Sequence, residues 1–497
     1  MAKQYATPGV YIEEKSAFSN SVVAVGTAIP AFIGHTEKAA AGKRDLTNTP
    51  MRITSLVEYL SYFGGAPKTT FNVDAEGDNY TVSVDGGNYM LFRSLQMFYA
   101  NGGGTCYIVS VGGYNDDVSP KTLVGAENGG GITALLKEQE PTLLVVPDAI
   151  SLEEGDCATV QQAMLKHCGA DTRSRFAILD VWNGNESRSM LDDDVVTRAR
   201  EAYGNNFLDF GAAYYPWLKA TVVQADEFDY TNVANLEGFV ELLNKEVDDN
   251  VAAGFVKAEK GELIKAEIAK MADADANVTA VHNIMKAVSP VYNDVLGQMR
   301  DMLNVLPPSG AVAGLYSLVD STVGVFKAPA NVSVSSVTGP TVNISATEQE
   351  DLNLPLSGKA INAIRPFVGK GTLVWGARTL DGNSQDWRYI NVRRTMIMLE
   401  QSVKFACEPF VFRPNDANTW IAVKSMIGSF LRSQWQAGAL VGATEDQAFQ
   451  VEVGLGTTMT PQDILDGYMK VSVKVAISRP AEFIVITFQQ KMPGGAE

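Results

Sequence analysis

The feature that most constrains the fold is an alternation of short apolar runs with helix-like segments in the first half of the chain. The strand-like runs are 105–111, 143–147, 176–182 and 213–223, and helical patterns cover 92–100 and 153–167. Strands that alternate with helices build a sheet with those helices packed against it. The sequence therefore predicts a mixed α/β domain, for which we take the bounds 21–345.

Two stretches interrupt this alternation. Residues 71–91 indicate a hairpin within an insertion at about 66–91, with Asp85–Gly86 as the turn signal. Residues 228–305 are rich in Ala, Glu and Lys at helical spacing, and Pro307–Pro308 follows them. This pattern predicts two or three helices. We expect both stretches to be additions to the α/β domain.

The C-terminal third has the most regular pattern and predicts a compact α+β domain over 346–487. Asp416 is a good N-cap for a helix that ends near Gly438. The apolar face of this helix consists of Trp420, Val423, Ile427, Phe430 and Leu431, and an earlier helix carries Met396, Leu399 and Val403. Alternating residues predict strands at 449–453, 469–477 and 482–490. We expect two helices against a small antiparallel sheet.

The first 20 residues are expected to form an extended arm, because Tyr5–Glu14 combines a Pro-Gly turn with strand-like alternation. A single strand needs a partner for its main-chain groups. Two alternatives stay open: an edge strand of its own domain, or a strand donated to a neighbouring chain. Residues 488–497 are expected to be a short tail. Glu13 and Glu14 stand where a signal peptide needs basic residues, so we expect synthesis in the cytoplasm.

Charge and composition exclude several classes of protein. The 497-residue chain has 40 basic and 57 acidic side chains, a formal charge of −17, and no basic run, which argues against nucleic acid as a partner. The apolar stretch 22–34 is shorter than the roughly 20 residues that a bilayer-spanning helix needs, so we expect no direct membrane insertion. The four cysteines lack CxxC spacing and are expected to be buried thiols.

The sequence contains no motif for catalysis or cofactor binding that we can identify. Its three histidines, His35, His167 and His282, are far apart and stand in no metal-ligand spacing. Neither a P-loop nor a nucleophile elbow occurs. Gly102–Gly104 precedes a strand, which predicts a turn rather than a phosphate-binding loop. We therefore expect no catalytic residue, no metal and no cofactor.

Several short motifs follow one another along most of the chain. They are PGVYIEE at Pro8–Glu14, YYPW at Tyr214–Trp217, DSTVGVFKAPAN at Asp320–Asn331, GTLVWGARTL at Gly371–Leu380, RYINVRR at Arg388–Arg394, FRPNDANTW at Phe412–Trp420 and PAEFI at Pro480–Ile484. In their order and spacing, these motifs resemble the contractile tail sheath proteins of bacteriophages and related injection systems.

The resemblance implies a mechanical, non-enzymatic subunit. In that family, subunits stack as hexameric rings into a helical sheath around an inner tube, above a baseplate. Contraction from a metastable extended state drives the tube through a target envelope. Expected partners are further copies of the chain, an inner tube protein, and baseplate and tail-terminator or cap proteins. The expected location is an assembled phage tail or injection particle.

The resemblance also assigns roles to segments. The terminal arms of the family add strands to the C-terminal sheets of neighbouring subunits, and the matching positions here are Val10, Tyr11, Ile12, Phe483, Val485 and Thr487. Residues 21–345 match the outer domain and residues 346–487 the inner, tube-facing domain. Lys424 and Arg432 lie mostly off the apolar face of their helix; they are candidates for tube contacts, or they simply solvate the helix. Arg378, Arg393 and Arg394 are candidates for either internal or inter-subunit ion pairs.

Two other functions stay open at this point. One is a non-contractile structural protein, such as a tube or baseplate component. The other is an α/β enzyme that uses the region 153–182. The sequence also leaves open which machine the chain serves: a phage tail, a tailocin, or an extracellular or membrane-anchored injection system.

Overall fold

The computed structural model of the chain describes residues 22–77, 79–127, 129–189 and 193–486. Its described residues divide into two compact units, which we call the large unit (26–397 and 479–486) and the small unit (398–478, with 22–25). The division falls inside helix α13 (Ile390–Cys407). The functional division into an outer domain 21–345 and an inner domain 346–487 stays a prediction.

The large unit is built on a nine-stranded mixed sheet with the strand order β13-β16-β15-β10-β9-β8-β1-β7-β4. Its strands in chain order are β1 (Pro30–Gly34), β4 (Met51–Ile53), β7 (Cys106–Ser110), β8 (Leu143–Val145), β9 (Phe176–Asp180), β10 (Gly211–Tyr215), β13 (Val332–Ser333), β15 (Asn362–Phe367) and β16 (Gly371–Val374). The strands from β15 to β7 run parallel, and antiparallel strands close both edges. The predicted mixed α/β fold is confirmed.

Alternate residues of the central strands enter two different cores. In β1, Phe32 belongs to one buried cluster and Ala31 and Ile33 to the other. Such alternation means that both faces of the sheet are covered. Helices that contribute to these clusters include α1 (Leu56–Phe63), α2 (Leu91–Ala100) and α11 (Ser309–Thr322) on the Phe32 face, and α5 (Glu154–Lys166) and α6 (Val195–Ala202) on the opposite face.

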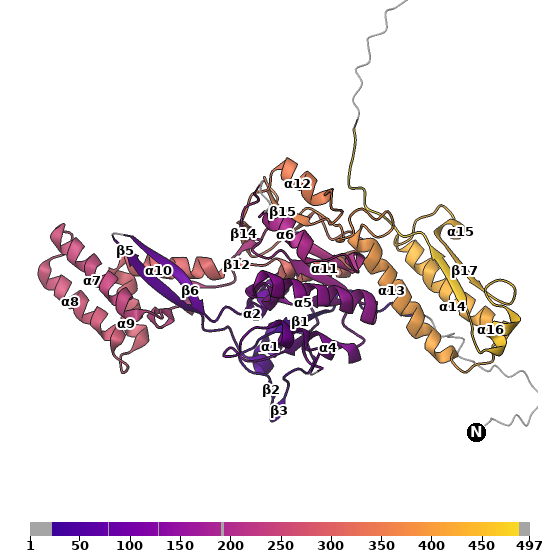
Figure 1. Cartoon of the computed structure of the whole chain (residues 1–497), viewed down its shortest axis with the longest axis horizontal. Coiled ribbons are helices and arrows are strands. Elements are labelled where there is room, and N and C mark those ends of the chain that lie inside the picture. Colours follow the sequence, from indigo (N-terminus) through magenta and orange to yellow (C-terminus); the bar gives the residue numbers. More distant parts are fainter. Residues whose placement is uncertain (1–21, 78, 128, 190–192, 487–497) are drawn as a thin grey trace, which may run out of the picture. The chain divides into compact units, whose positions relative to one another are not determined.

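The two predicted additions pack together as one subdomain of the large unit. The hairpin strands β5 (Thr70–Glu76) and β6 (Asn79–Gly86) share a core with the helices α7 (Leu236–Ala252), α8 (Ala258–Ala269), α9 (Val278–Val288) and α10 (Pro290–Leu303). Figure 1 shows the hairpin beside these helices. We call this unit the insertion subdomain.

Two details of the predicted additions are wrong. The hairpin turns after Glu76, at Gly77, whose φ is +66°, and Asp85–Gly86 closes the end of β6 instead. With the turn at Gly77, the alternate residues Phe71 and Val73 of β5 both point into the core of the insertion subdomain. Their burial favours this turn over one at Asp85–Gly86. The helical stretch contains four helices rather than two or three, because Asn277 and Ser289 each cap a new helix.

The small unit follows the predicted pattern closely. Helix α14 (Ala417–Gln436) begins at the predicted cap, where the Asp416 carboxylate accepts the Thr419 amide at 2.9 Å. It packs against the antiparallel hairpin of β17 (Phe449–Val453) and β18 (Val471–Val475). The short helices α15 (Glu445–Ala448) and α16 (Pro461–Leu465) complete the unit. The predicted last strand, 482–490, forms no ladder over the part that the structure describes, 482–486.

The remaining short elements of the large unit connect these layers. They are β2 (Ala40–Ala41), β3 (Arg44–Asp45), β11 (Leu218–Ala220), β12 (Val305–Leu306), β14 (Val337–Pro340), α3 (Pro120–Val124), α4 (Gly131–Ala134) and α12 (Ala346–Asn353). Strands β12, β11 and β14 form a small antiparallel sheet. The glycine turn before β7 has the predicted backbone, since Gly102 has a φ of +91°.

Candidate functional site

The C-terminal segment ends the described chain with an exposed apolar run. Of the predicted arm positions, Val10, Tyr11, Ile12 and Thr487 lie outside the described residues, whereas Phe483 and Val485 lie within them. Phe483 is 68% exposed and Val485 is 88% exposed, and Ile484 and Ile486 between and after them are similarly open. Four consecutive exposed apolar side chains form the kind of surface that a partner usually covers.

Directly before this run, Glu482 is held from several sides. Arg378 Nε donates to Glu482 Oε1 at 3.0 Å and Arg378 Nη2 donates to Oε2 at 2.6 Å. Asn353 Nδ2 donates to Oε1 at 2.7 Å, and the Tyr389 hydroxyl donates to Oε2 at 3.3 Å. We call these four residues the Glu482 clamp. Burial disfavours the charged carboxylate, but the hydrogen bonds outweigh it, so the pKa of Glu482 lies below its usual value.

The arginine of the clamp is fixed to the large sheet. Its side chain is only 2% exposed. Asn362, the first residue of β15, accepts the Arg378 amide at 2.8 Å and donates to the Arg378 carbonyl at 2.8 Å. Asn362 also donates to the Ala213 carbonyl of β10. These bonds fix the main chain of Arg378, and its guanidinium is held separately, because Nη1 donates to the Gly382 carbonyl at 3.2 Å.

Arg394, the second candidate arginine, forms a buried pair with Asp320 of α11. Arg394 Nη2 lies 2.6 Å from Asp320 Oδ2 and Nη1 lies 3.1 Å from Oδ1, with both side chains at most 5% exposed. Nη2 also donates to the Thr27 carbonyl at 3.0 Å, and the guanidinium lies 4.5 Å from the ring centroid of Tyr316. This pair joins the start of the large unit to α11 and α13.

Arg393, the third, pairs with Asp209 and is stacked between two aromatic rings. Its guanidinium carbon lies 3.6 Å from the centroid of Trp387 and 4.4 Å from that of Phe210. Arginine favours such arrangements because its planar cation pairs and stacks at once. All three arginines thus form ion pairs inside the large unit. A role for them between subunits stays a prediction.

The two candidate tube-facing residues of α14 differ from each other. The side chain of Lys424 is exposed, and the structure gives it no ion pair among the described residues. Arg432 makes a two-bond ion pair with Glu445, at 2.9 and 2.8 Å, in the same small unit. Its charge is already balanced at the surface, so Lys424 is the more available cation.

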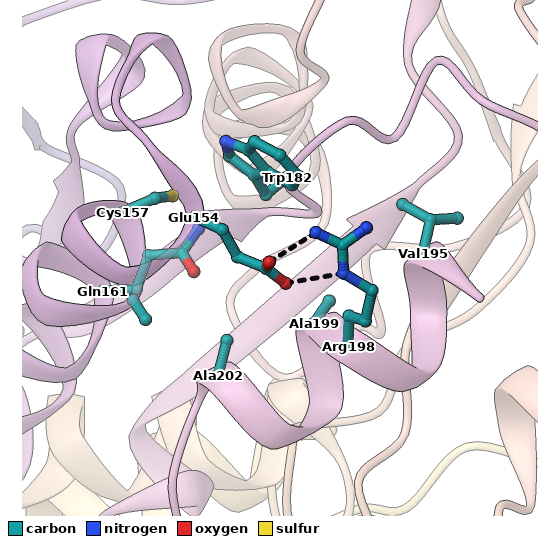
Figure 2. Close-up of a pocket in the computed structure, with 9 residues that line it drawn as sticks. Glu154, Cys157, Gln161, Trp182, Val195, Arg198, Ala199 and Ala202 are labelled. Carbon is teal, nitrogen blue, oxygen red and sulfur yellow. Dashed lines mark hydrogen bonds and ion pairs between the residues drawn. The ribbon is translucent and has the colours of Figure 1, made fainter. Parts of the chain in front are cut away.

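A hollow lies in the region of the enzyme alternative (Figure 2). Its volume of about 10 Å³ admits at most one water molecule. Figure 2 shows the Glu154 carboxylate turned to the Arg198 guanidinium, with which it forms a two-bond ion pair, and Arg198 lies 5.2 Å from the Trp182 ring centroid. Burial raises the pKa of the nearby Cys157 thiol to about 12, which leaves no thiolate nucleophile at neutral pH.

The histidines do not come together in the structure. His35 lies 3.2 Å from Asp148, His167 bonds Arg175, and His282 bonds the Tyr292 hydroxyl. Within the described residues, no three His, Cys, Asp or Glu side chains are grouped so as to hold a metal ion. A search of the same residues finds no helix with the length and hydrophobicity to cross a bilayer.

Sequence reasoning missed the partners in these clusters. The sequence pattern places Glu482 in a strand and Asp320 and Tyr389 in motifs without indicating their arginine partners, and nothing in it marks Asn353 or Asp209. A single carboxylate at the head of the otherwise apolar run EFIVITF is the only local signal, because the arginine that binds it lies 104 residues away.

Comparison with known proteins agrees with this architecture. Residues 383–491 match the family model of the phage tail sheath C-terminal domain. The tail sheath protein of Vibrio phage KVP40 is 24% identical over 199 residues, which is 40% of this chain and 28% of that protein. That of Burkholderia phage BcepMu is 29% identical over 141 residues, 27% of this chain and 29% of that protein. The chain thus aligns with less than a third of the length of these relatives.

Solved structures match over nearly the whole length. The chain resembles the sheath of the anti-feeding prophage in its contracted state, with a TM-score of 0.60, 27% identity, and coverage of 98% of this chain and 100% of that one. The sheath complex of PVC, an extracellular contractile injection system, in its contracted state gives a TM-score of 0.60, 27% identity and 99% coverage of both chains. A chain of the anti-feeding prophage baseplate gives a TM-score of 0.61. Residues 383–491 thus match the tail sheath family, and nearly the whole chain is similar to sheath proteins of contractile injection systems.

Proposed function

We propose that this chain is the subunit of a contractile sheath. Copies polymerise helically around an inner tube in an extended, metastable state, and contraction drives the tube through a target envelope. The observation that carries this proposal is the end-to-end similarity, at 27% identity, to sheath proteins solved in the contracted state. A helical assembly follows from a contact between unlike surfaces that does not close into a ring.

The terminal segments are the proposed links between copies. The run 483–486 is apolar and exposed, and among the described residues β17 and β18 form a two-stranded sheet that can accept a further strand. Main-chain hydrogen bonds from an added strand tolerate changes at side-chain interfaces. Links of this kind therefore persist while the bodies of the subunits move against each other during contraction.

The small unit is the proposed face towards the inner tube. Lys424 supports this part, since it is an exposed cation on α14, suited to an acidic partner. Arg432 is the weaker candidate because Glu445 already binds it. Baseplate and terminator proteins complete the proposed set of partners.

Electron microscopy of the purified protein, expressed alone and stained, tests the proposal. Hollow, ridged cylinders are expected, and removal of residues 1–16 should abolish them. A tube or baseplate component would assemble equally well without those residues. Thermal stabilisation by a small metabolite, which we do not expect, would favour the enzyme alternative.

A further inference from the structure

The C-terminal segment makes few contacts before its exposed run. Between Arg479 and Ile486, the described contacts are those of Arg479 with Gln385 and Asp386, which are exposed, and those of the Glu482 clamp. Glu482 is therefore the last point at which the described chain is tied down, one residue before Phe483. Three separate elements or loops supply the clamp: the end of α12, the loop after β16 and the residue before α13.

We propose that the Glu482 clamp is the anchor of the C-terminal arm: it fixes where and in which direction the segment leaves the large unit to reach a second copy of this chain. This inference rests on the proposed function, since the second copy is the occupant that a sheath supplies. It adds positioning residues, Arg378, Asn353 and Tyr389, to a link whose strand-forming residues follow directly.

The chemistry of the clamp suits an anchor. The Arg378 side chain is buried and its Nη1 donates to the Gly382 carbonyl at 3.2 Å, so little side-chain entropy is lost when it pairs with Glu482. The two parallel N–H···O bonds fix the orientation of the carboxylate as well as its position. An ordinary surface pair leaves both side chains mobile and has neither property.

A similar arrangement occurs at the other end of the large unit. Arg394, paired with Asp320, and the Thr142 hydroxyl both donate to the Thr27 carbonyl, at 3.0 and 2.7 Å. Thr27 is the second residue of the large unit after the N-terminal segment. Both terminal segments are thus tied to the large unit by a buried arginine. Tension on either segment is then delivered to the large unit.

Spin-label distance measurement tests the anchor directly. One label is placed at Ile484→Cys and the reference label at Thr159→Cys, an exposed position on α5, in a Cys407→Ser background that removes the half-buried thiol. Labelled chains are diluted with an excess of unlabelled chains, so that the distances are intramolecular. The parent should give a narrow distribution.

Loss of the clamp should broaden this distribution. In Glu482→Ala, the six residues from Arg479 to Ile484 behave as a free linker with a spread of roughly 13 Å. Glu482→Gln and Tyr389→Phe should give intermediate widths, and Tyr389→Phe removes only one hydroxyl, which keeps the test valid where a harsher variant misfolds. The matched control is Glu445→Gln, which breaks the Arg432 pair and should leave the width unchanged.

Equal widths in Glu482→Ala and the parent would overturn the anchor. The spin-label distances can be measured on chains that form no cylinders, so the anchor can be tested even if the proposed sheath function is wrong. Where cylinders form, those of Glu482→Ala should dissociate at a lower guanidinium concentration than those of Glu445→Gln. Equal dissociation midpoints would overturn the role of the clamp in joining copies.

Discussion

Replacement of Asp320 by Asn should destabilise the large unit strongly, because it leaves the buried cation of Arg394 without its counter-charge. The two side chains are 3% and 5% exposed and share two hydrogen bonds. Removal of one partner from such a buried pair costs about 3–5 kcal/mol, since the remaining charge stays desolvated. The Thr27 carbonyl and the Tyr316 ring compensate only part of this charge.

Calorimetric melting measures this loss. With about 2.1 cal/mol/K per residue, a unit of this size has an unfolding entropy of roughly 0.8 kcal/mol/K, so the melting temperature should fall by about 4–6 °C. Lys121→Gln is the control: it breaks an exposed pair with Glu127 in the same unit, at 65% and 67% exposure, and should shift melting by at most about 1 °C.

The double variant Asp320→Leu with Arg394→Met completes the test. It removes both charges and keeps apolar volume, so much of the lost stability should return. A melting shift for Asp320→Asn as small as that of Lys121→Gln would refute the argument from burial.

Three further predictions concern charge. Lys424→Glu should weaken co-sedimentation with tube filaments without changing the melting temperature, and unchanged binding would remove Lys424 from the tube interface. The pKa of Glu482 is lowered in the folded chain. The clamp therefore contributes its full stability above the unfolded pKa of about 4.3, and this stability is lost as the pH falls through the folded pKa. The spin-label distance distribution should broaden in that acidic window and stay narrow at neutral pH. Burial raises the pKa of Asp180 to about 7 despite the hydrogen bond from the Ser309 amide, so this group costs the parent stability between pH 4 and 7 as the pH rises. Asp180→Asn should lack this contribution and differ in slope over that range, and an equal slope in both proteins would contradict the assignment.

Local patterns predicted much of the fold. The buried strands alternate with helices as expected, and the Asp416 cap marks the true start of α14, because both signals depend on residues close in sequence. The turn of the β5–β6 hairpin was misplaced because Asp85–Gly86 is a good turn by itself. A turn at Asp85–Gly86 is disfavoured because Phe71 and Val73 pack into a core formed by helices that lie far along the chain.

The candidate site was less predictable for the same reason. Arginines 378, 393 and 394 were singled out, but their carboxylates lie 104, 184 and 74 residues away. No periodicity or spacing relates residues so far apart in sequence. Which arginine meets which acid is decided by the strand order of the sheet and by the return of residues 479–486 to the large unit.

The insertion subdomain draws one core from two stretches that lie far apart in the gene. Val73 and Asn235 exchange two hydrogen bonds, at 2.8 and 2.9 Å, and Phe71 bridges to Val233. Deletion of the helices alone would uncover Phe71, Val73 and Val82. A chimaera of this chain must therefore exchange the hairpin and the helices together. Because the two segments share one core, a mutation in either segment affects the packing of the other.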